Sequence, residues 1–80
     1  MEGTVATDAE IREAIQHTSS SRLDEAIAEF IHDRRNQEIA RKKILENVRY
    51  EPLSEEYGLS PGQVKNIIRK ARRTIFEHLN

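Results

Sequence analysis

Eighty residues without a cysteine leave room for one small domain and exclude disulfides, thiolate zinc sites and a cysteine nucleophile. The N-terminus lacks the basic start and the long apolar run of a signal peptide, and no stretch approaches the roughly 20 apolar residues that span a bilayer. We therefore expect a soluble, cytoplasmic protein with no membrane partner.

The net charge of −1 hides a polarised chain. Residues 1–33 carry eight acids and two bases, whereas residues 34–80 carry eleven bases and six acids. Between Ser60 and Phe76 there are five bases and no acid. This asymmetry indicates an anionic partner for the basic half, although a solvated helix face explains the charge pattern equally well when it is taken alone.

Apolar residues recur at helical spacing along the whole chain, and no segment alternates over five or more residues as a strand would. The first helix is predicted to start at Thr7, where Thr7 and Glu10 fit a capping box. The second is predicted to start at Ser21. Its apolar stripe has strong amphipathic spacing and consists of Leu23, Ala26, Ile27, Phe30 and Ile31.

Two further helices are predicted in the middle of the chain. The first runs from about Asn36 to Glu46, and Asn47 is a plausible left-handed C-terminal cap for it. The second is short and covers 50–57, with Gly58 ending it. A proline at position 52 is compatible with this helix because the first turn has no intrahelical N–H bond to lose.

The last predicted helix has the clearest boundaries. Ser60 is its N-cap, Pro61 occupies the first helical position, and Gln63 can complete a capping box. One face is apolar to the end of the chain and is formed by Val64, Ile67, Ile68, Ala71, Ile75 and Leu79. The opposite face carries Lys65, Asn66, Arg69, Lys70 and Arg73.

A short helix, a turn that contains glycine and a second helix form a helix-turn-helix, which places its second helix in the major groove of DNA. On this interpretation, the base edges are read by Gln63, Lys65, Asn66 and Arg69. Phosphates are contacted by Lys70, Arg72 and Arg73. We therefore predict an all-α fold of four to five short helices, with an acidic helical pair at 7–33 packed on a C-terminal helix-turn-helix at 36–79.

Residues 50–72 resemble region 4 of bacterial sigma factors and the small sigma-like regulators of phages and mobile elements. The likeness is carried by 56–60 (Glu-Tyr-Gly-Leu-Ser), 64–66 (Val-Lys-Asn) and 69–72 (Arg-Lys-Ala-Arg), and 37–47 looks like the helix that precedes the motif in that family. The resemblance implies DNA contacts at Ser60, Gly62, Gln63, Lys65, Asn66 and Arg69. It also implies RNA polymerase as a possible partner.

Three residues depart from the family pattern. Lys42 stands where the family has an apolar residue, Arg49 stands at the usual Ser/Thr cap, and Ser54 stands at the usual alanine. Taken as complete, 80 residues cannot hold the domain with which sigma factors melt the start site. The DNA-binding domain of LuxR-type regulators is the nearest competing family, and it predicts the same helix in the same groove.

Two other interpretations compete with sequence-specific DNA binding. The basic helix could serve only structure or solubility, or the chain could be an adaptor that binds RNA polymerase or another regulator, with DNA contact secondary. We expect no enzyme, metal site or cofactor, because the three histidines are isolated in the sequence and the adjacent carboxylates diverge on a helix. Phe76 lies off the apolar stripe and is expected to pack against the first or second helix, with a dimer contact as the alternative.

Overall fold

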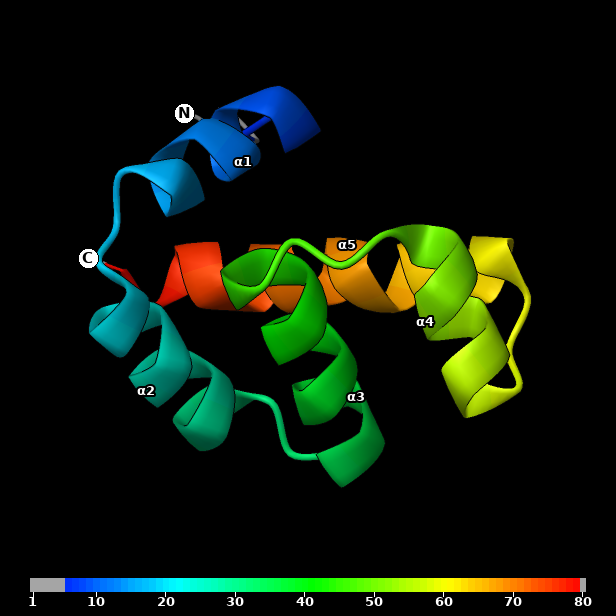
Figure 1. Ribbon diagram of the computed structural model, residues 1–80. Helices are drawn as coiled ribbons and strands as arrows, with labels where there is room; N and C mark the ends of the chain where they lie inside the picture. The colour runs from blue at the N-terminus through cyan, green and yellow to red at the C-terminus, as the bar shows by residue number, and fades with distance from the viewer. Residues whose placement is uncertain (1–5, 80) are drawn as a thin grey trace.

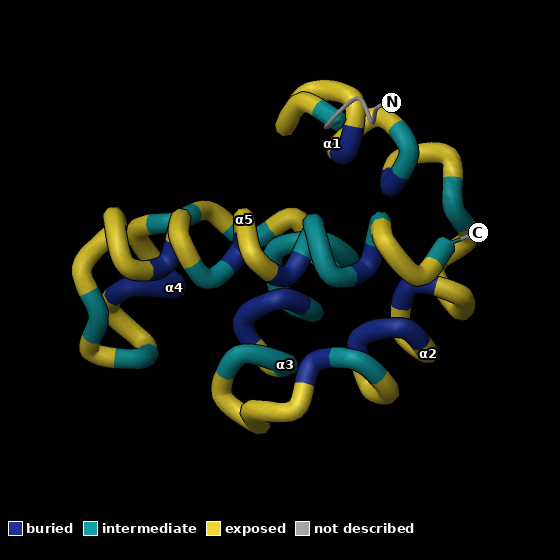
Figure 2. Tube along the Cα trace, turned by 180° about the vertical axis from the view of Figure 1, so that it is seen from behind, coloured by how far each residue is buried: buried dark blue, intermediate teal, exposed yellow. Residues whose placement is uncertain are grey.

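The computed structural model describes residues 6–79 of the chain. Every regular element in that range is helical, as the periodicity predicts: α1 (Asp8–Gln16), α2 (Ser20–Phe30), α3 (Arg34–Ala40), a π-helical segment η1 (Arg41–Leu45), α4 (Tyr50–Tyr57) and α5 (Pro61–Glu77). Figure 1 shows α5 running through the middle of the molecule, with α1 on one side and α2 and α3 on the other. Figure 2 shows the same arrangement from behind. No helix within residues 6–79 is long and apolar enough to cross a membrane.

The first two helices begin at capping residues. Thr7 and Glu10 form the predicted capping box, in which the Thr7 side chain accepts from the Glu10 N–H at 3.1 Å and Glu10 Oε1 accepts from the Thr7 N–H at 2.8 Å. Helix α2 begins at Ser20, one residue earlier than predicted, because the Ser19 hydroxyl caps it by accepting from the Arg22 N–H. With three consecutive serines, the sequence offered several equivalent caps.

Helix α3 begins at Arg34 and not at the predicted Asn36. The reason is a local cap that the prediction overlooked, since the Asp33 carboxylate accepts from the Asn36 N–H at 3.0 Å. From Arg41 the helix continues as a π-helix and ends at Leu45, and Asn47 then adopts the predicted left-handed conformation with φ 57°. Lys42 and Lys43, although consecutive, both reach aromatic rings of α4.

Helices α4 and α5 have the predicted starts, and their connection is tightly defined. Gly58 ends α4 in the left-handed conformation with φ 66°, and the Leu59 N–H donates to the Ser54 carbonyl at 2.9 Å. Ser60 and Gln63 form both hydrogen bonds of the predicted capping box. This connection fixes the direction in which α5 leaves α4.

The core consists of two clusters that share α5. The larger cluster joins α1, α2 and the C-terminal half of α5 and contains Ile11, Ile15, Leu23, Ala26, Ile27, Ile31, Ala40, Ala71 and Ile75. The smaller cluster joins α3, α4 and the N-terminal half of α5 and contains Ile39, Leu53, Val64 and Ile68. Phe76 is half-buried and packs against the larger cluster, as expected for a residue under the first two helices. Helix α5 therefore links the two clusters along its length, and α3 links them as well, with Ala40 in the larger cluster and Ile39 in the smaller one.

The left-handed residue at the end of α4 gives a first test of the fold. We expect Gly58→Ala to lower the free energy of unfolding by about 1–2 kcal/mol, because an L-residue is strained at positive φ. A Cβ at this position would have no atom within 4 Å, so the loss would come from the backbone and not from a clash. Urea unfolding of Gly58→Ala and Gly58→Asn measures it, and asparagine should cost less.

Gly62→Ala is the matched control for this test. Gly62 lies in the first turn of α5, and a Cβ there would meet only the Ser60 Oγ at 3.9 Å, which is ordinary contact. This variant should be neutral or more stable by up to about 1 kcal/mol. Equal losses at Gly58 and Gly62 would contradict the left-handed cap.

Candidate nucleic-acid interface

The N-terminus of α5 is exposed, and its first residues have small side chains. Ser60, Pro61 and Gly62 are all exposed, and neither steric contact nor positive φ requires glycine at position 62. Gln63 is exposed too, but its Oε1 accepts from the Ser60 N–H at 2.8 Å. While the capping box is intact, the amide nitrogen can donate to an outside partner, and the oxygen keeps one further lone pair.

The remaining predicted site residues lie along one helix but differ in exposure. Lys65, Asn66, Arg69 and Lys70 are exposed, whereas Arg72 and Arg73 are half-buried. The apolar stripe of α5 faces the core as the sequence predicts, with Val64, Ile68 and Ile75 fully buried. The structure thus brings Lys65, Arg69 and Lys70 to the part of α5 that the core leaves uncovered, whereas Arg72 and Arg73 are partly covered.

The acidic helix α1 contacts this basic surface directly. Asp8 lies 3.5 Å from the Arg69 Nε and 3.8 Å from an Arg73 terminal nitrogen. The side chains of Asp8 and Arg69 are 56% and 62% exposed, so this pairing is solvent-screened and weak, worth at most about 1 kcal/mol. Two of the predicted DNA contacts therefore already have a carboxylate neighbour that the sequence analysis did not assign to them.

Beside α5, three adjoining hollows form what we call the basic groove. It runs between α1, η1 and the N-terminus of α4, and the hollow nearest α1 has a volume of about 180 Å³. The hollows share lining residues, since Tyr50 and Lys65 line two of them and Arg12 and Arg72 line another pair. The cations of the groove are Arg12, Lys43, Arg49, Lys65, Arg69 and Arg72, and its acids are Asp8 and Glu51.

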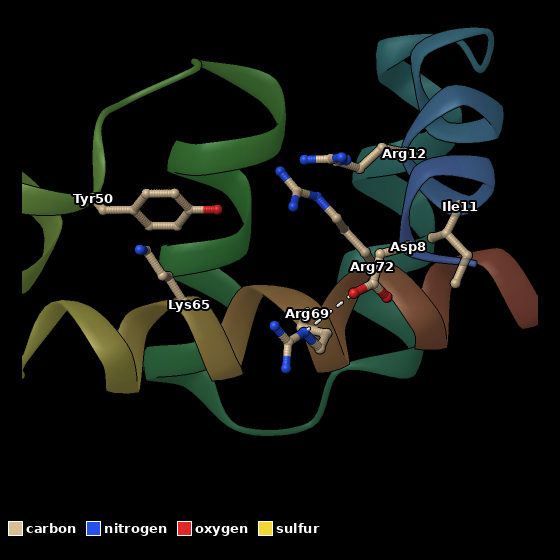
Figure 3. A pocket seen from close by; sticks show the side chains of 7 residues that line it. All are labelled: Asp8, Ile11, Arg12, Tyr50, Lys65, Arg69 and Arg72. Carbon is tan, nitrogen blue, oxygen red and sulfur yellow. Dashed lines mark ion pairs between the residues drawn. The ribbon is translucent and has the colours of Figure 1, made fainter. Parts of the chain in front are cut away.

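Tyr50 organises the middle of the basic groove. The Lys43 Nζ lies 4.3 Å from the centroid of the Tyr50 ring, and the Lys65 Nζ lies 5.6 Å from it. Both distances fall in the range of cation–π attraction. Figure 3 shows Lys65 reaching from α5 toward this ring. The Tyr50 ring thus attracts both Lys43 of η1 and Lys65 of α5, which brings the two cations close to the same ring.

The start of α4 also opens on the basic groove. Arg49 is its N-cap and makes no side-chain capping hydrogen bond, which matches the departure noted at this position. The first N–H groups of an uncapped helix, together with its dipole, favour an anion. Arg49 and Tyr50 line the hollow at this end.

The other two departures from the family pattern have structural roles. Lys42 is half-buried, makes an ion pair with Glu56 and lies 5.1 Å from the Tyr57 ring centroid. The hydrogen bond to the Glu56 carboxylate raises the pKa of Lys42 above its usual value. Burial raises the pKa of the Tyr57 phenol, whose O–H donates to Glu38 Oε1 at 3.0 Å. These contacts join η1 and α3 to α4.

The buried hydroxyl of Ser54 is satisfied within its own helix. The residue is 7% exposed, and its Oγ donates to the Glu51 carbonyl at 2.8 Å. A serine at this position therefore leaves no unpaired polar group in the core.

Sequence reasoning missed six charged or aromatic side chains of the basic groove: Asp8, Arg12, Lys43, Arg49, Tyr50 and Glu51. A local signal existed for Arg12, which is the only base of α1 and directly follows the buried Ile11. No comparable signal existed for Tyr50, because the two cations at its ring, Lys43 and Lys65, belong to two other helical elements. His78, for its part, stacks on Phe30 with ring centroids 3.7 Å apart. Within residues 6–79, no three His, Cys, Asp or Glu side chains are grouped so that they could hold a metal ion.

Comparisons with protein-family models, with curated proteins and with solved structures gave no match to this chain. Geometry and charge are therefore the grounds on which a function can be argued.

Proposed function

We propose that this chain binds double-stranded DNA with sequence preference, acts in transcription regulation and places α5 in the major groove. The observation that carries the proposal is the surface of α5 that the core leaves uncovered, where Lys65, Asn66, Arg69 and Lys70 are exposed directly after a capped N-terminus. In this proposal, α4, the turn at Gly58 and α5 act as a helix-turn-helix. The resemblance to sigma region 4 supports the same arrangement and adds RNA polymerase as a candidate partner.

The roles of the side chains follow from their exposure. Lys65, Asn66 and Arg69 are assigned to base edges, because they are exposed in the N-terminal half of α5, which enters the groove in this class of motif. Gln63 can donate to a base through its amide nitrogen while its oxygen stays in the capping bond to the Ser60 N–H. Lys70, Arg72 and Arg73 are assigned to phosphates, and the bare backbone at Gly62 permits a close approach of the sugar-phosphate chain.

The charge balance agrees with this division of roles. The chain as a whole is slightly acidic, so a general attraction to DNA through net charge is not expected. Binding must therefore come from a localised basic surface, and the cations of α5 and the basic groove supply one. The exposed acids of α1 and α2, such as Glu10, Glu13 and Glu29, do not line the basic groove.

The proposal is tested by fluorescence anisotropy with a pool of random duplex DNA across a salt series. A surface that contacts four or five phosphates should give a slope of log K against log[salt] of about −4. Selection from the pool should then yield a preferred site whose affinity exceeds that of random DNA by about 10³-fold or more. A flat, weak response would contradict DNA binding and would favour the protein-adaptor alternative, with RNA polymerase as the first partner to test.

A further inference from the structure

Helix α1 is held firmly against α5 and brings one base with it. Ile11 and Ile15 are only 2% and 6% exposed, and they pack in the same cluster as Ala71 and Ile75 of α5. Arg12 follows Ile11 and lines two hollows of the basic groove. The position of Arg12 beside α5 is therefore fixed by the packing of α1 and not by a flexible N-terminal arm.

Arg12 and Arg72 form a pair of like charges within the basic groove. Both line the same two hollows, and Figure 3 shows the two guanidinium groups extending toward each other from α1 and α5. Among residues 6–79, no carboxylate lies within ion-pair distance of either group. The carboxylate of this hollow, Asp8, contacts Arg69 and Arg73 instead.

Two neighbouring guanidinium groups that have no carboxylate of residues 6–79 within ion-pair distance suit one particular kind of ligand. Each presents a planar fork of N–H donors that matches the oxygens of a phosphate, and their mutual repulsion is relieved when an anion lies between them. The other acids of α1, Glu10 and Glu13, do not line this hollow. The otherwise acidic helix thus turns its single base toward the groove.

The groove extends this site along the flank of α5. From Arg12 and Arg72 it continues past Lys65 and Tyr50 to Lys43 and the uncapped start of α4. A helix that lies in the major groove has a sugar-phosphate chain along each flank. A row of cations along one flank of α5 therefore suits an extended polyanion such as a sugar-phosphate chain better than a single small anion.

We propose that the basic groove holds the sugar-phosphate backbone of one DNA strand, with Arg12 of α1 and Arg72 together binding one of its phosphates. This inference rests on the proposed function, and it gives the N-terminal half of the chain a direct part in DNA contact. Lys65 and Arg69 also line the groove but keep the base-reading role proposed for them on the preferred site, so the phosphate contacts there come from the other cations of the groove. Its consequence is that α1, despite its net negative charge, strengthens binding to DNA.

The first experiment compares Arg12→Ala with the wild-type chain in the same salt series on random duplex DNA. Loss of one phosphate contact should make the slope less negative by about 0.9, and it should weaken the preferred site and random DNA by equal factors. Arg34→Ala is the matched control, because Arg34 is exposed at the end of α3 that lies away from α5 in Figure 1. Arg12→Lys, which keeps the charge, should recover most of the slope.

The second experiment locates the phosphate. Neutral methylphosphonates are placed singly along each strand of the preferred duplex, and each is tested with wild-type protein and with Arg12→Ala. One position should weaken the wild type but not the variant, because the contact is already missing in the variant. That position should lie on the strand that runs along the α1 side of α5. It should lie outside the base pairs at which Arg69→Ala changes the sequence preference.

The outcomes separate the two proposals. If Arg12→Ala binds with wild-type slope and affinity, or more tightly, while substitutions in α5 weaken binding, the groove proposal is overturned and the proposed function stands. If the wild-type chain itself shows no salt-dependent DNA binding, both are overturned. Circular dichroism of Arg12→Ala checks that α1 stays helical, which we expect because Arg12 is exposed.

Discussion

Replacing Ile68 by alanine is expected to lower the free energy of unfolding by about 2–5 kcal/mol, which is the range for a fully buried side chain. Ile68 is fully buried and belongs to the cluster that joins α3, α4 and α5, where only Ile39, Leu53 and Val64 are buried with it. A cluster this small has few neighbours that could move into the cavity. A small domain has about 5–15 kcal/mol of stability in total, so the variant would lose a large part of it.

The measurement is urea unfolding followed by far-UV circular dichroism, with Ile67→Ala as the matched control. Ile67 is the preceding residue of the same helix and is only half-buried against the same cluster. Its replacement removes the same atoms but leaves a smaller cavity, so its cost should be well below that of Ile68→Ala. Equal costs for the two variants would show that the face of α5 buried in the core is assigned wrongly.

The variant Lys65→Ala/Arg69→Ala is expected to have the largest effect on binding. On random duplex DNA, where the preferred bases are absent, Lys65 and Arg69 should contact phosphates, so removing both cations should change the salt slope from about −4 to about −2. Affinity for random duplex DNA at low salt should fall by about one to two orders of magnitude. On the preferred site, Arg69→Ala alone should cost roughly 1–3 kcal/mol if this side chain reads a guanine, and an equal loss on all sequences would make Arg69 a phosphate contact instead.

The double variant needs a control that removes the same charge elsewhere. Arg34→Ala/Arg35→Ala serves this purpose, since both residues are exposed in the first turn of α3, and Arg35 contacts only the neighbouring Asn36 side chain among the hydrogen bonds of residues 6–79. This control should bind DNA with nearly wild-type slope. If both double variants lose binding equally, then net charge and not the surface of α5 governs the interaction, and the major-groove assignment fails.

The ends of the helices were largely predictable, because each end is decided within a few residues. Each capping box joins two residues three positions apart, Thr7 with Glu10 and Ser60 with Gln63, so it can be predicted from the local sequence. Gly58 and Asn47 adopt positive φ for the same local reason. The start of α3 was placed two residues late only because the cap at Asp33 was overlooked.

The π-helical segment η1 was not predictable in this way. Its residues have ordinary helical spacing, and the wider turn places Lys42 and Lys43 against the rings of Tyr57 and Tyr50. No local feature of 41–45 distinguishes the two helical hydrogen-bond patterns, so the sequence did not predict which one is adopted.

By itself, the sequence determined that the chain is helical, which face of α5 is buried and that the opposite face carries Lys65, Asn66 and Arg69, since helical period alone separates those faces. Only the tertiary structure decided that α1 lies beside α5. This packing brings Asp8 to Arg69 and Arg12 to Arg72, pairs about sixty positions apart in the chain. Local patterns fix which side of a helix is apolar, but they hold no information on which helix will cover it, because that choice depends on the shapes and volumes of all the buried side chains together.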